Sequence, residues 1–200
     1  MNIVLLGIQG SGKGTQAALL AEQVGAKHID VGDLLRHRAQ QDDALGRKIK
    51  GLLTKGKLVP DVISNKLVAA ALKDAPDGWI LDGYPRDLAE AEYLDQIADV
   101  ELVIFLEISD KLAVERLSKR RVCGKCHAIS DSSKKKCAEC GSALVHREDD
   151  KPEAIKERLE VFHDVTEPLM EYYRVRELVR RVDASGSVNE VFKKVLADLR

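Results

Sequence analysis

The segment GIQGSGKGT, residues 7–15, constrains the fold of this chain more than any other stretch. It directly follows a short apolar run, NIVLLG (2–7), and it leads into a helix-like stretch, GKGTQAALLAEQVG (12–25). Glycines leave backbone N–H groups free to close around phosphate oxygens, and the N-terminus of a helix adds a favourable dipole. We therefore predict a strand, a phosphate-binding loop and a helix, with the ammonium group of Lys13 reaching the phosphates.

This loop departs from the general phosphate-loop pattern at one position. Gly14, and not Ser or Thr, follows Lys13, so a hydroxyl group arrives only at Thr15. The hydroxyl that usually holds Mg²⁺ is thus displaced by one place. Because Mg²⁺ gives up its water reluctantly, we expect nucleotide phosphates and water to hold it. The loop residues predicted to bind ATP are Gly10, Ser11, Gly12, Lys13, Gly14 and Thr15.

Short apolar runs alternate with longer helical patterns along the rest of the chain. Strands are expected at 2–7, 27–30, 78–82, 101–108 and 178–183. Helices are expected at 12–25, 62–75, 87–98, 109–121 and 151–177, the last with one apolar stripe of Ile155, Leu159, Phe162, Leu169 and Tyr172. Strand–helix alternation predicts an α/β fold with a parallel sheet, here of five strands, covered by helices on both faces.

Two segments break the alternation, and we interpret both as insertions that project from one domain. Residues 31–59 are helical and polar, with three glycines, and residues 122–147 lack periodicity and contain all four cysteines. The remaining stretches, 1–30, 60–121 and 148–200, are predicted to form the core. A chain of 200 residues is long enough for one such domain with a buried core.

Motifs spread over nearly the whole chain resemble those of adenylate kinase and its nucleoside monophosphate kinase relatives. They are GKGT (12–15), VGDLLR (31–36), GKLVPD (56–61), DGYPR (82–86), and the RRV and REDD stretches that flank the cysteines. The resemblance implies the P-loop nucleoside monophosphate kinase fold, with a monophosphate-binding insertion and a mobile lid. It also implies reversible, Mg²⁺-dependent transfer of the terminal phosphoryl group of ATP to AMP, which gives two ADP.

The resemblance assigns roles to single residues. Arg36 and Arg86 correspond to arginines that hold the monophosphate, and Arg120 and Arg147 to lid arginines that close over the transferred group. Arg158 corresponds to an arginine that reaches the phosphates from the core. Arginine suits these roles because its planar fork grips phosphate oxygens and keeps its proton. With Lys13, the implied catalytic residues are Arg86, Arg120, Arg147 and Arg158.

Further residues complete the implied site. Arg116 corresponds to the arginine near the adenine of ATP, and Asp82 to an acid that orients magnesium-bound water, with Asp33 as a second candidate. Asp149 and Asp150 correspond to an acidic pair linked to lid movement. The implied monophosphate-binding residues are Val31, Arg36, Gly83, Arg86, Glu90, Arg147 and Arg158.

The monophosphate pocket departs from the family at two positions, where Val31 replaces a usual Thr and Glu90 a usual Gln. An ionised Glu only accepts hydrogen bonds, so it would face the N1 lone pair of adenine unfavourably. Guanine and cytosine offer donors that suit a carboxylate better. The sequence therefore leaves two acceptors open: AMP, or GMP and CMP in a kinase of broader preference. A third interpretation is that the side chain of Glu90 points into solvent and that backbone atoms recognise the base.

The four cysteines form two Cys-x-x-Cys pairs, Cys123 with Cys126 and Cys137 with Cys140, ten residues apart. This spacing predicts a four-thiolate zinc site, and four protein ligands leave no open position for catalysis. The metal is thus expected to be structural, bracing a lid with too little apolar content to fold alone. His127 is an alternative ligand, and a redox dithiol is the alternative function.

Composition and net charge limit the classes of partner that the chain is expected to bind. The net charge is −1 and aromatic residues make up 4% of the chain, which disfavours nucleic-acid binding. We expect no signal peptide, no membrane span and a cytoplasmic monomer whose partners are ATP, AMP and ADP. Two other functions stay open: a zinc-ribbon nucleic-acid binder, and a P-loop ATPase switch that hydrolyses ATP without an acceptor.

Overall fold

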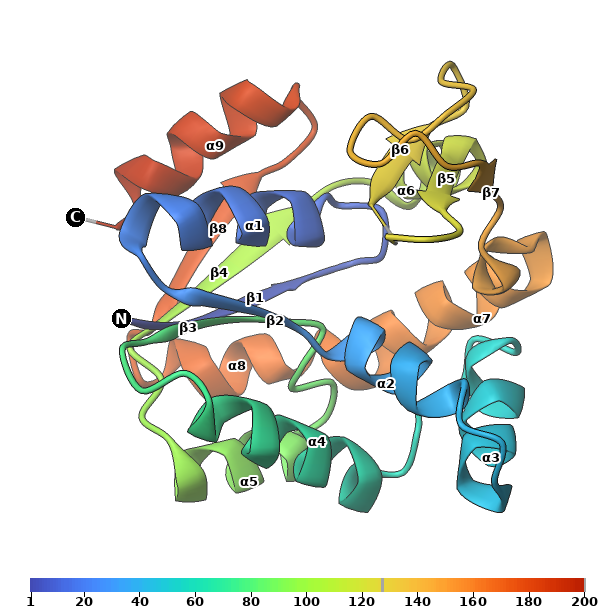
Figure 1. The fold of residues 1–200 in the computed structure, drawn as a ribbon. Helices are drawn as coiled ribbons and strands as arrows, with labels where there is room; N and C mark the ends of the chain where they lie inside the picture. The colour runs from blue at the N-terminus through green and yellow to red at the C-terminus, as the bar shows by residue number, and fades with distance from the viewer. Residues whose placement is uncertain (127, 200) are drawn as a thin grey trace.

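Five parallel strands form the central sheet, in the order β2-β3-β1-β4-β8 (Figure 1). Their bounds are Asn2–Gly7 (β1), Lys27–Asp30 (β2), Trp79–Asp82 (β3), Leu102–Glu107 (β4) and Val179–Asp183 (β8). The computed structural model describes residues 1–126 and 128–199. The α/β fold class and the five-stranded parallel sheet predicted from the sequence are therefore confirmed.

Alternate residues of the central strand β1 serve two separate cores, as the two-residue period of a strand requires. Ile3 and Leu5 face helices α1 (Lys13–Val24) and α9 (Val188–Ala197). Val4 and Leu6 face the opposite layer, which includes α4 (Asp61–Lys73), α5 (Leu88–Ile97) and α8 (Leu169–Arg174). Figure 1 shows these two helical layers on either side of the sheet.

Helix α9 was not expected from the sequence. Ser187 caps it and Glu190 completes a capping box, because each side chain bonds to the backbone N–H of the other residue. The Ser-x-x-Glu spacing, followed by the buried Val191 and Val195, is the signal that would have revealed this helix.

The single long helix predicted at 151–177 is wrong. The structure has α7 (Pro152–Val161), a π-helical turn (Phe162–Thr166) and α8. Pro168 has no N–H to donate, and the widened turn bonds the N–H of Glu167 to the carbonyl of Phe162 at 2.7 Å. The extra residue rotates the apolar stripe, so that Tyr173, and not the predicted Tyr172, is fully buried.

The two segments that interrupt the alternation fold differently. Residues 31–59 contain α2 (Val31–Ala39) and α3 (Ala44–Leu53), which contact each other. Residues 120–145 contain a small antiparallel sheet in the order β6-β5-β7, with β5 at Arg120–Cys123, β6 at Ile129–Asp131 and β7 at Leu144–Val145. These three short strands were not predicted. Helix α6 (Asp110–Lys119) leads directly into this small sheet.

Candidate functional site

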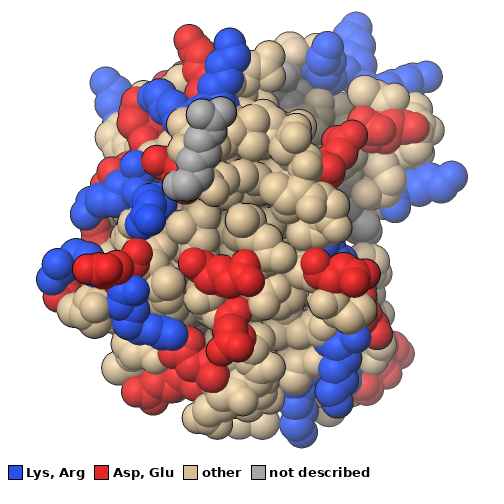
Figure 2. Space-filling model, turned by 90° about the vertical axis from the view of Figure 1, so that its left-hand side faces the viewer, with Lys and Arg blue, Asp and Glu red and all other residues tan. Residues whose placement is uncertain are grey.

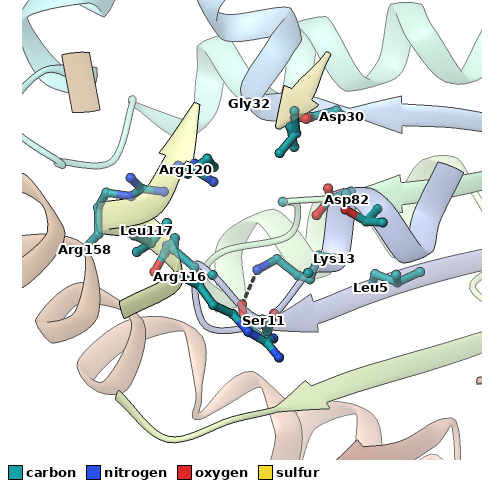
Figure 3. Close-up of a pocket in the computed structure, with 18 of the residues that line it drawn as sticks. Leu5, Ser11, Lys13, Asp30, Gly32, Asp82, Arg116, Leu117, Arg120 and Arg158 are labelled. Carbon is teal, nitrogen blue, oxygen red and sulfur yellow. Dashed lines mark hydrogen bonds between the residues drawn. The ribbon is translucent and has the colours of Figure 1, made fainter. Parts of the chain in front are cut away.

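A cavity of about 680 Å³ lies at the carboxyl ends of the parallel strands, where open α/β sheets place their ligands. Residues from the core and from both interrupting segments line it (Figure 3). Among the residues predicted from the sequence, the structure brings these together on its wall: Gly10, Ser11, Gly12, Lys13, Gly14, Thr15, Arg36, Asp82, Gly83, Arg86, Arg116, Arg120, Arg147 and Arg158.

The phosphate loop takes its shape from glycines that no other residue replaces easily. Gly12 has φ 94° at the start of α1, and a Cβ on Gly7 would come within 2.4 Å of the carbonyl oxygen of Leu106. Lys13 folds back over the loop, and its Nζ donates to the carbonyls of Gly7 at 2.5 Å and Ile8 at 3.0 Å. Burial lowers the pKa of Lys13 to about 8.

Asp82 ends β3 beside this loop and lies close to the backbone of Gly14. A Cβ on Gly14 would lie 3.2 Å from Oδ2 of Asp82, tighter than most real Cβ contacts. Burial, and then the nearby carboxylate of Asp30, raise the pKa of Asp82 to about 7. Asp30 ends the neighbouring strand β2 in register with Asp82. Figure 3 shows Lys13 and Asp82 together on one side of the cavity.

Three arginines meet two aspartates on the other side of the cavity. Asp150 accepts from Nε and Nη2 of Arg120 at 2.7 and 2.5 Å and from Nη1 of Arg158 at 3.2 Å. Arg147 donates from Nε to Asp149 at 3.1 Å. Burial lowers the pKa of Arg158 to about 10, while the surrounding arginines hold the pKa of Asp149 low against its own burial. The two carboxylates therefore hold three guanidinium groups at the wall of the cavity.

Arg36 on α2 is held by two acids at the start of its own helix, the capping residue Asp30 and Asp33. Its Nε donates to Oδ1 of Asp33 at 2.8 Å, and its Nη2 lies 3.6 Å from Oδ2 of Asp30. Burial alone would lower the pKa of Arg36, but these two carboxylates raise it. Asp33 does not line the main cavity; with Arg36 and Arg147 it lines a small neighbouring one of about 50 Å³.

Arg116 lies at the end of the cavity nearest β8. Its guanidinium donates to the carbonyls of Ala184 at 3.0 Å, Ser185 at 3.1 Å and Gly186 at 3.2 Å. These three carbonyls belong to the loop between β8 and α9, and the cavity wall includes that loop. Arg116 therefore holds this loop in place through three hydrogen bonds.

Val31 and Glu90, the two residues predicted to read the acceptor base, are not among the described residues that line the cavity. Val31 is 1% exposed and Glu90 is 2% exposed. Glu90 Oε2 accepts the backbone N–H of Arg86 at 2.8 Å, so the carboxylate faces the inner side of the Arg86 loop. The solvent-facing reading of Glu90 is wrong, because the side chain is buried. Burial raises the pKa of Glu90 to about 7.

The four cysteines converge as their spacing predicted. Their Sγ atoms all lie within 4.8 Å of one another, with Cys123 and Cys140 at 3.4 Å and Cys126 and Cys137 at 3.5 Å. Four thiolates around Zn²⁺ at about 2.3 Å would lie about 3.8 Å apart, close to these separations. The N–H groups of Lys125 and Cys126 donate to the sulfur of Cys123, which stabilises a thiolate there. The residues therefore fit a zinc ion. His127 lies outside the described residues.

The surface shows how charge is distributed away from the cavity. On the face that carries the chain ends, acidic and basic side chains are interspersed around an uncharged centre (Figure 2). Among the described residues, no helix is long and apolar enough to cross a membrane.

Sequence reasoning missed several residues of the cavity wall, including Asp30 and Thr166. Asp30 had a detectable signal, since an acid at the carboxyl end of a parallel strand points toward the ligand edge. Thr166 had none, because it reaches the cavity only through the π-helical turn.

Comparison with known proteins gives a consistent result. A family model described as adenylate kinase matches residues 5–178. A protein named adenylate kinase from Methanothrix thermoacetophila is 42% identical over 208 residues, covering 98% of this chain and 96% of that protein. Proteins of the same name from Thermosipho melanesiensis and Caldicellulosiruptor bescii are 40% and 39% identical, covering 100% of this chain and 100% and 99% of their own lengths.

Proposed function

The chain belongs to the adenylate kinase family, and from this premise we propose which of its residues carry the reaction. Its function is that of an adenylate kinase: a phosphotransferase that moves the terminal phosphoryl group of ATP to AMP and gives two ADP. The observation that carries the assignment of roles is the convergence of Lys13 and six arginines from the core and both interrupting segments on one cavity. The proposed division is a core of 1–30, 60–121 and 148–200, an acceptor segment of 31–59 and a lid of 122–147.

Two polyanions must meet in this cavity, so catalysis rests on positioning and on neutralising charge. In the proposed scheme, the N–H groups of the loop 10–15 and the Lys13 ammonium hold the phosphates of ATP. Arg36 and Arg86 hold the phosphate of AMP. Arg120, Arg147 and Arg158 stabilise the charge on the group in transfer. No protein nucleophile is required, and the acceptor phosphate oxygen attacks directly.

Four of these arginines are held on carboxylates of the protein itself. Asp149 and Asp150 accept from Arg120, Arg147 and Arg158, and Asp33 accepts from Arg36. In the scheme, phosphate oxygens replace these carboxylates as partners, and the exchange draws the lid over the cavity and excludes water. Arg116 shapes the adenine end of the ATP site through the loop it braces.

The two metals have separate proposed roles. Asp82, buried at the cavity and next to the phosphate loop, would accept hydrogen bonds from water bound to Mg²⁺, with Asp33 as a more distant second acid. Mg²⁺ bound with ATP neutralises phosphate charge. Zn²⁺ would be held by Cys123, Cys126, Cys137 and Cys140 and would brace the lid. Burial raises the pKa of Asp82 in the absence of a cation, and a bound cation favours its ionised form.

The alternative acceptors and the cellular setting remain sequence predictions. The acceptor is AMP in the proposed function, with GMP or CMP as the alternative. The proposed enzyme is a cytoplasmic monomer that binds ATP, AMP and ADP and neither nucleic acid nor membrane.

A coupled assay tests the function and the acceptor together. ATP·Mg²⁺ is supplied with AMP, GMP, CMP or UMP, and ADP formation is measured for each acceptor. The proposal requires fast transfer with AMP and slow ADP formation when no acceptor is present. Rapid hydrolysis without an acceptor would support the ATPase switch, and tight, salt-sensitive retention of DNA or RNA on a filter would support the zinc ribbon.

Site variants test the assignment of roles. Arg86→Ala is expected to lower the transfer rate by orders of magnitude with the fold intact, because it removes a cation from the acceptor phosphate. Arg174→Ala is the matched control, since Arg174 is 66% exposed and its ion pair among the described residues is with Glu171 on the same helix. Near-normal turnover of Arg86→Ala would contradict the assigned role of this arginine.

A further inference from the structure

The backbone of Arg86 is clamped on both sides of its Cα atom. Its N–H donates to Oε2 of Glu90 at 2.8 Å, and its carbonyl oxygen accepts the hydroxyl of Thr166 at 2.7 Å. The guanidinium Nε of Arg86 donates back to the carbonyl of Gly83 at 2.8 Å. The two backbone bonds fix the φ and ψ angles of this residue, so they fix the direction in which its side chain leaves the chain.

The first clamp is a buried acid. Glu90 lies in the first turn of α5 and is 2% exposed, and its own N–H is capped by Asp87 at 2.8 Å. The hydroxyl of Ser64 on α4 faces the same carboxyl group. Below it, the hydroxyl of Tyr84 donates to Asn65 at 2.6 Å and contacts the carbonyl of Glu90 at 3.1 Å. The polar atoms of Glu90 are thus occupied inside the protein.

The second clamp comes from the π-helical turn, which was not predicted from the sequence. Phe162 anchors this turn in the core, where it is 4% exposed and its ring stacks on Phe105 with centroids 6.2 Å apart. Phe162 accepts the N–H of Glu167, five residues on, which widens the turn at Thr166. The turn continues directly from α7, the helix that carries Arg158. Thr166 therefore ties the Arg86 loop to the helix of a second cavity arginine.

We propose that Glu90 and Thr166 are positioning residues that hold the guanidinium of Arg86 in place for the acceptor phosphate, and that Glu90 does not read the acceptor base. This inference rests on the proposed function, in which Arg86 binds that phosphate. Glu90 acts through the backbone N–H of Arg86 and Thr166 acts through its carbonyl. The replacement of a usual Gln by Glu at position 90 then leaves the acceptor preference unchanged, because either residue supplies the oxygen that accepts from Arg86.

Thr166 gives the cleanest test. Thr166→Val removes the hydroxyl at nearly constant volume, and we expect kcat/KM for AMP to fall about five- to tenfold while KM for ATP stays constant. Thr166→Ser restores the hydroxyl and should recover most of the loss. Thr54→Val is the matched control, since in the part of the chain that the structure describes the hydroxyl of Thr54 bonds within its own helix end, to the carbonyls of Lys50 at 3.0 Å and Gly51 at 3.3 Å. A uniform loss for both substrates, or no recovery in Thr166→Ser, would overturn the proposal.

Combination with Arg86→Ala separates positioning from general destabilisation. If Thr166 acts through the Arg86 side chain, Thr166→Val should cause no further loss of kcat/KM for AMP in the Arg86→Ala background. Independent, multiplying losses in the double variant would refute the inference. Because Arg86→Ala alone tests the proposed role of Arg86, near-normal turnover of that variant would instead be a failure of the proposed function.

Position 90 tests the second half of the proposal. Glu90→Leu should lower kcat/KM for AMP and for GMP by the same factor, because it removes an acceptor from the Arg86 backbone. Glu90→Gln should leave the ratio of kcat/KM values for AMP and GMP unchanged. A shift of that ratio toward AMP in Glu90→Gln would show that the side chain reads the base, and it would overturn the assignment of Glu90 as a positioning residue.

Discussion

Glu90→Gln is expected to change the way in which stability depends on pH. The Glu90 carboxyl is 2% exposed, and burial raises its pKa from 4.5 to about 7 in the folded enzyme. The unfolded chain releases this proton near pH 4.5, whereas the folded enzyme keeps it until about pH 7. Folding therefore binds a proton between these values, and the free energy of unfolding falls as pH rises through that window.

The size of the effect follows from the pKa difference. Each pKa unit corresponds to about 1.4 kcal/mol, so the carboxyl of Glu90 costs the wild-type enzyme about 3 kcal/mol above pH 7 relative to pH 4.5. Gln does not titrate, and its amide oxygen still accepts from the backbone N–H of Arg86. The stability of Glu90→Gln relative to wild type should accordingly rise by about 2 to 3 kcal/mol between pH 5 and pH 8.

Urea unfolding of both proteins without nucleotide, at intervals from pH 5 to pH 8, measures this difference. Other groups, including Asp82, titrate in both proteins and cancel in the comparison. Glu115→Gln is the control, because Glu115 is exposed and its hydrogen bond with Lys119 lowers its pKa, so its contribution has the opposite sign. A stability difference for Glu90→Gln that stays flat across the range would refute the reasoning.

Three further variants probe other parts of the molecule. Cys137→Ser should abolish stoichiometric zinc binding and lower the melting temperature, while phosphoryl transfer survives at low temperature; metal analysis and calorimetry measure both. Gly56→Ala should lower the free energy of unfolding, measured in urea, by about 1 to 3 kcal/mol, because φ of Gly56 is +74° and the Cβ would lie 2.6 Å from the carbonyl oxygen of Ala154. Gly51→Ala is the control: its Cβ would meet nothing within 4 Å, and the change should stabilise α3. Asp150→Asn removes a fully buried carboxylate from two arginines, so it should lower the free energy of unfolding by about 3 kcal/mol. Adding ATP should then raise the melting temperature of this variant more than that of wild type.

The sequence predicts the sheet and most of the cavity wall because both depend on local patterns. Apolar runs such as 2–7 and 102–107 mark buried parallel strands, and the loop 10–15 carries its own glycine and lysine signature. The carboxyl ends of parallel strands meet at one edge, so an acid such as Asp82 falls at the cavity without further information. The cysteine spacing likewise fixes which four sulfur atoms come together.

What the sequence does not predict depends on contacts between segments far apart in the chain. The apolar stripe of 151–177 matches one continuous helix, and only packing of Phe162 against Phe105 and the missing N–H of Pro168 select the π-helical turn. The sequence shows that position 90 carries a carboxyl group, which can accept hydrogen bonds. It does not show that the donor is the backbone N–H of Arg86, because that contact depends on how the Arg86 loop packs on α5. Strands β6 and β7 are too short to leave a periodic pattern.

The arrangement of charge explains how one cavity binds two polyanions and still folds without them. Arg120, Arg147 and Arg158 are each less than one-sixth exposed, and buried cations without partners would destabilise the fold. Asp149 and Asp150 supply those partners within the protein, but three guanidinium groups exceed two carboxylates by one positive charge. In the proposed scheme, that surplus attracts phosphate, and an arginine exchanges its carboxylate partner for a phosphate oxygen of the incoming nucleotide. Under that scheme, the exchange makes binding energy available for moving the proposed lid, residues 122–147, as well as for holding the substrates.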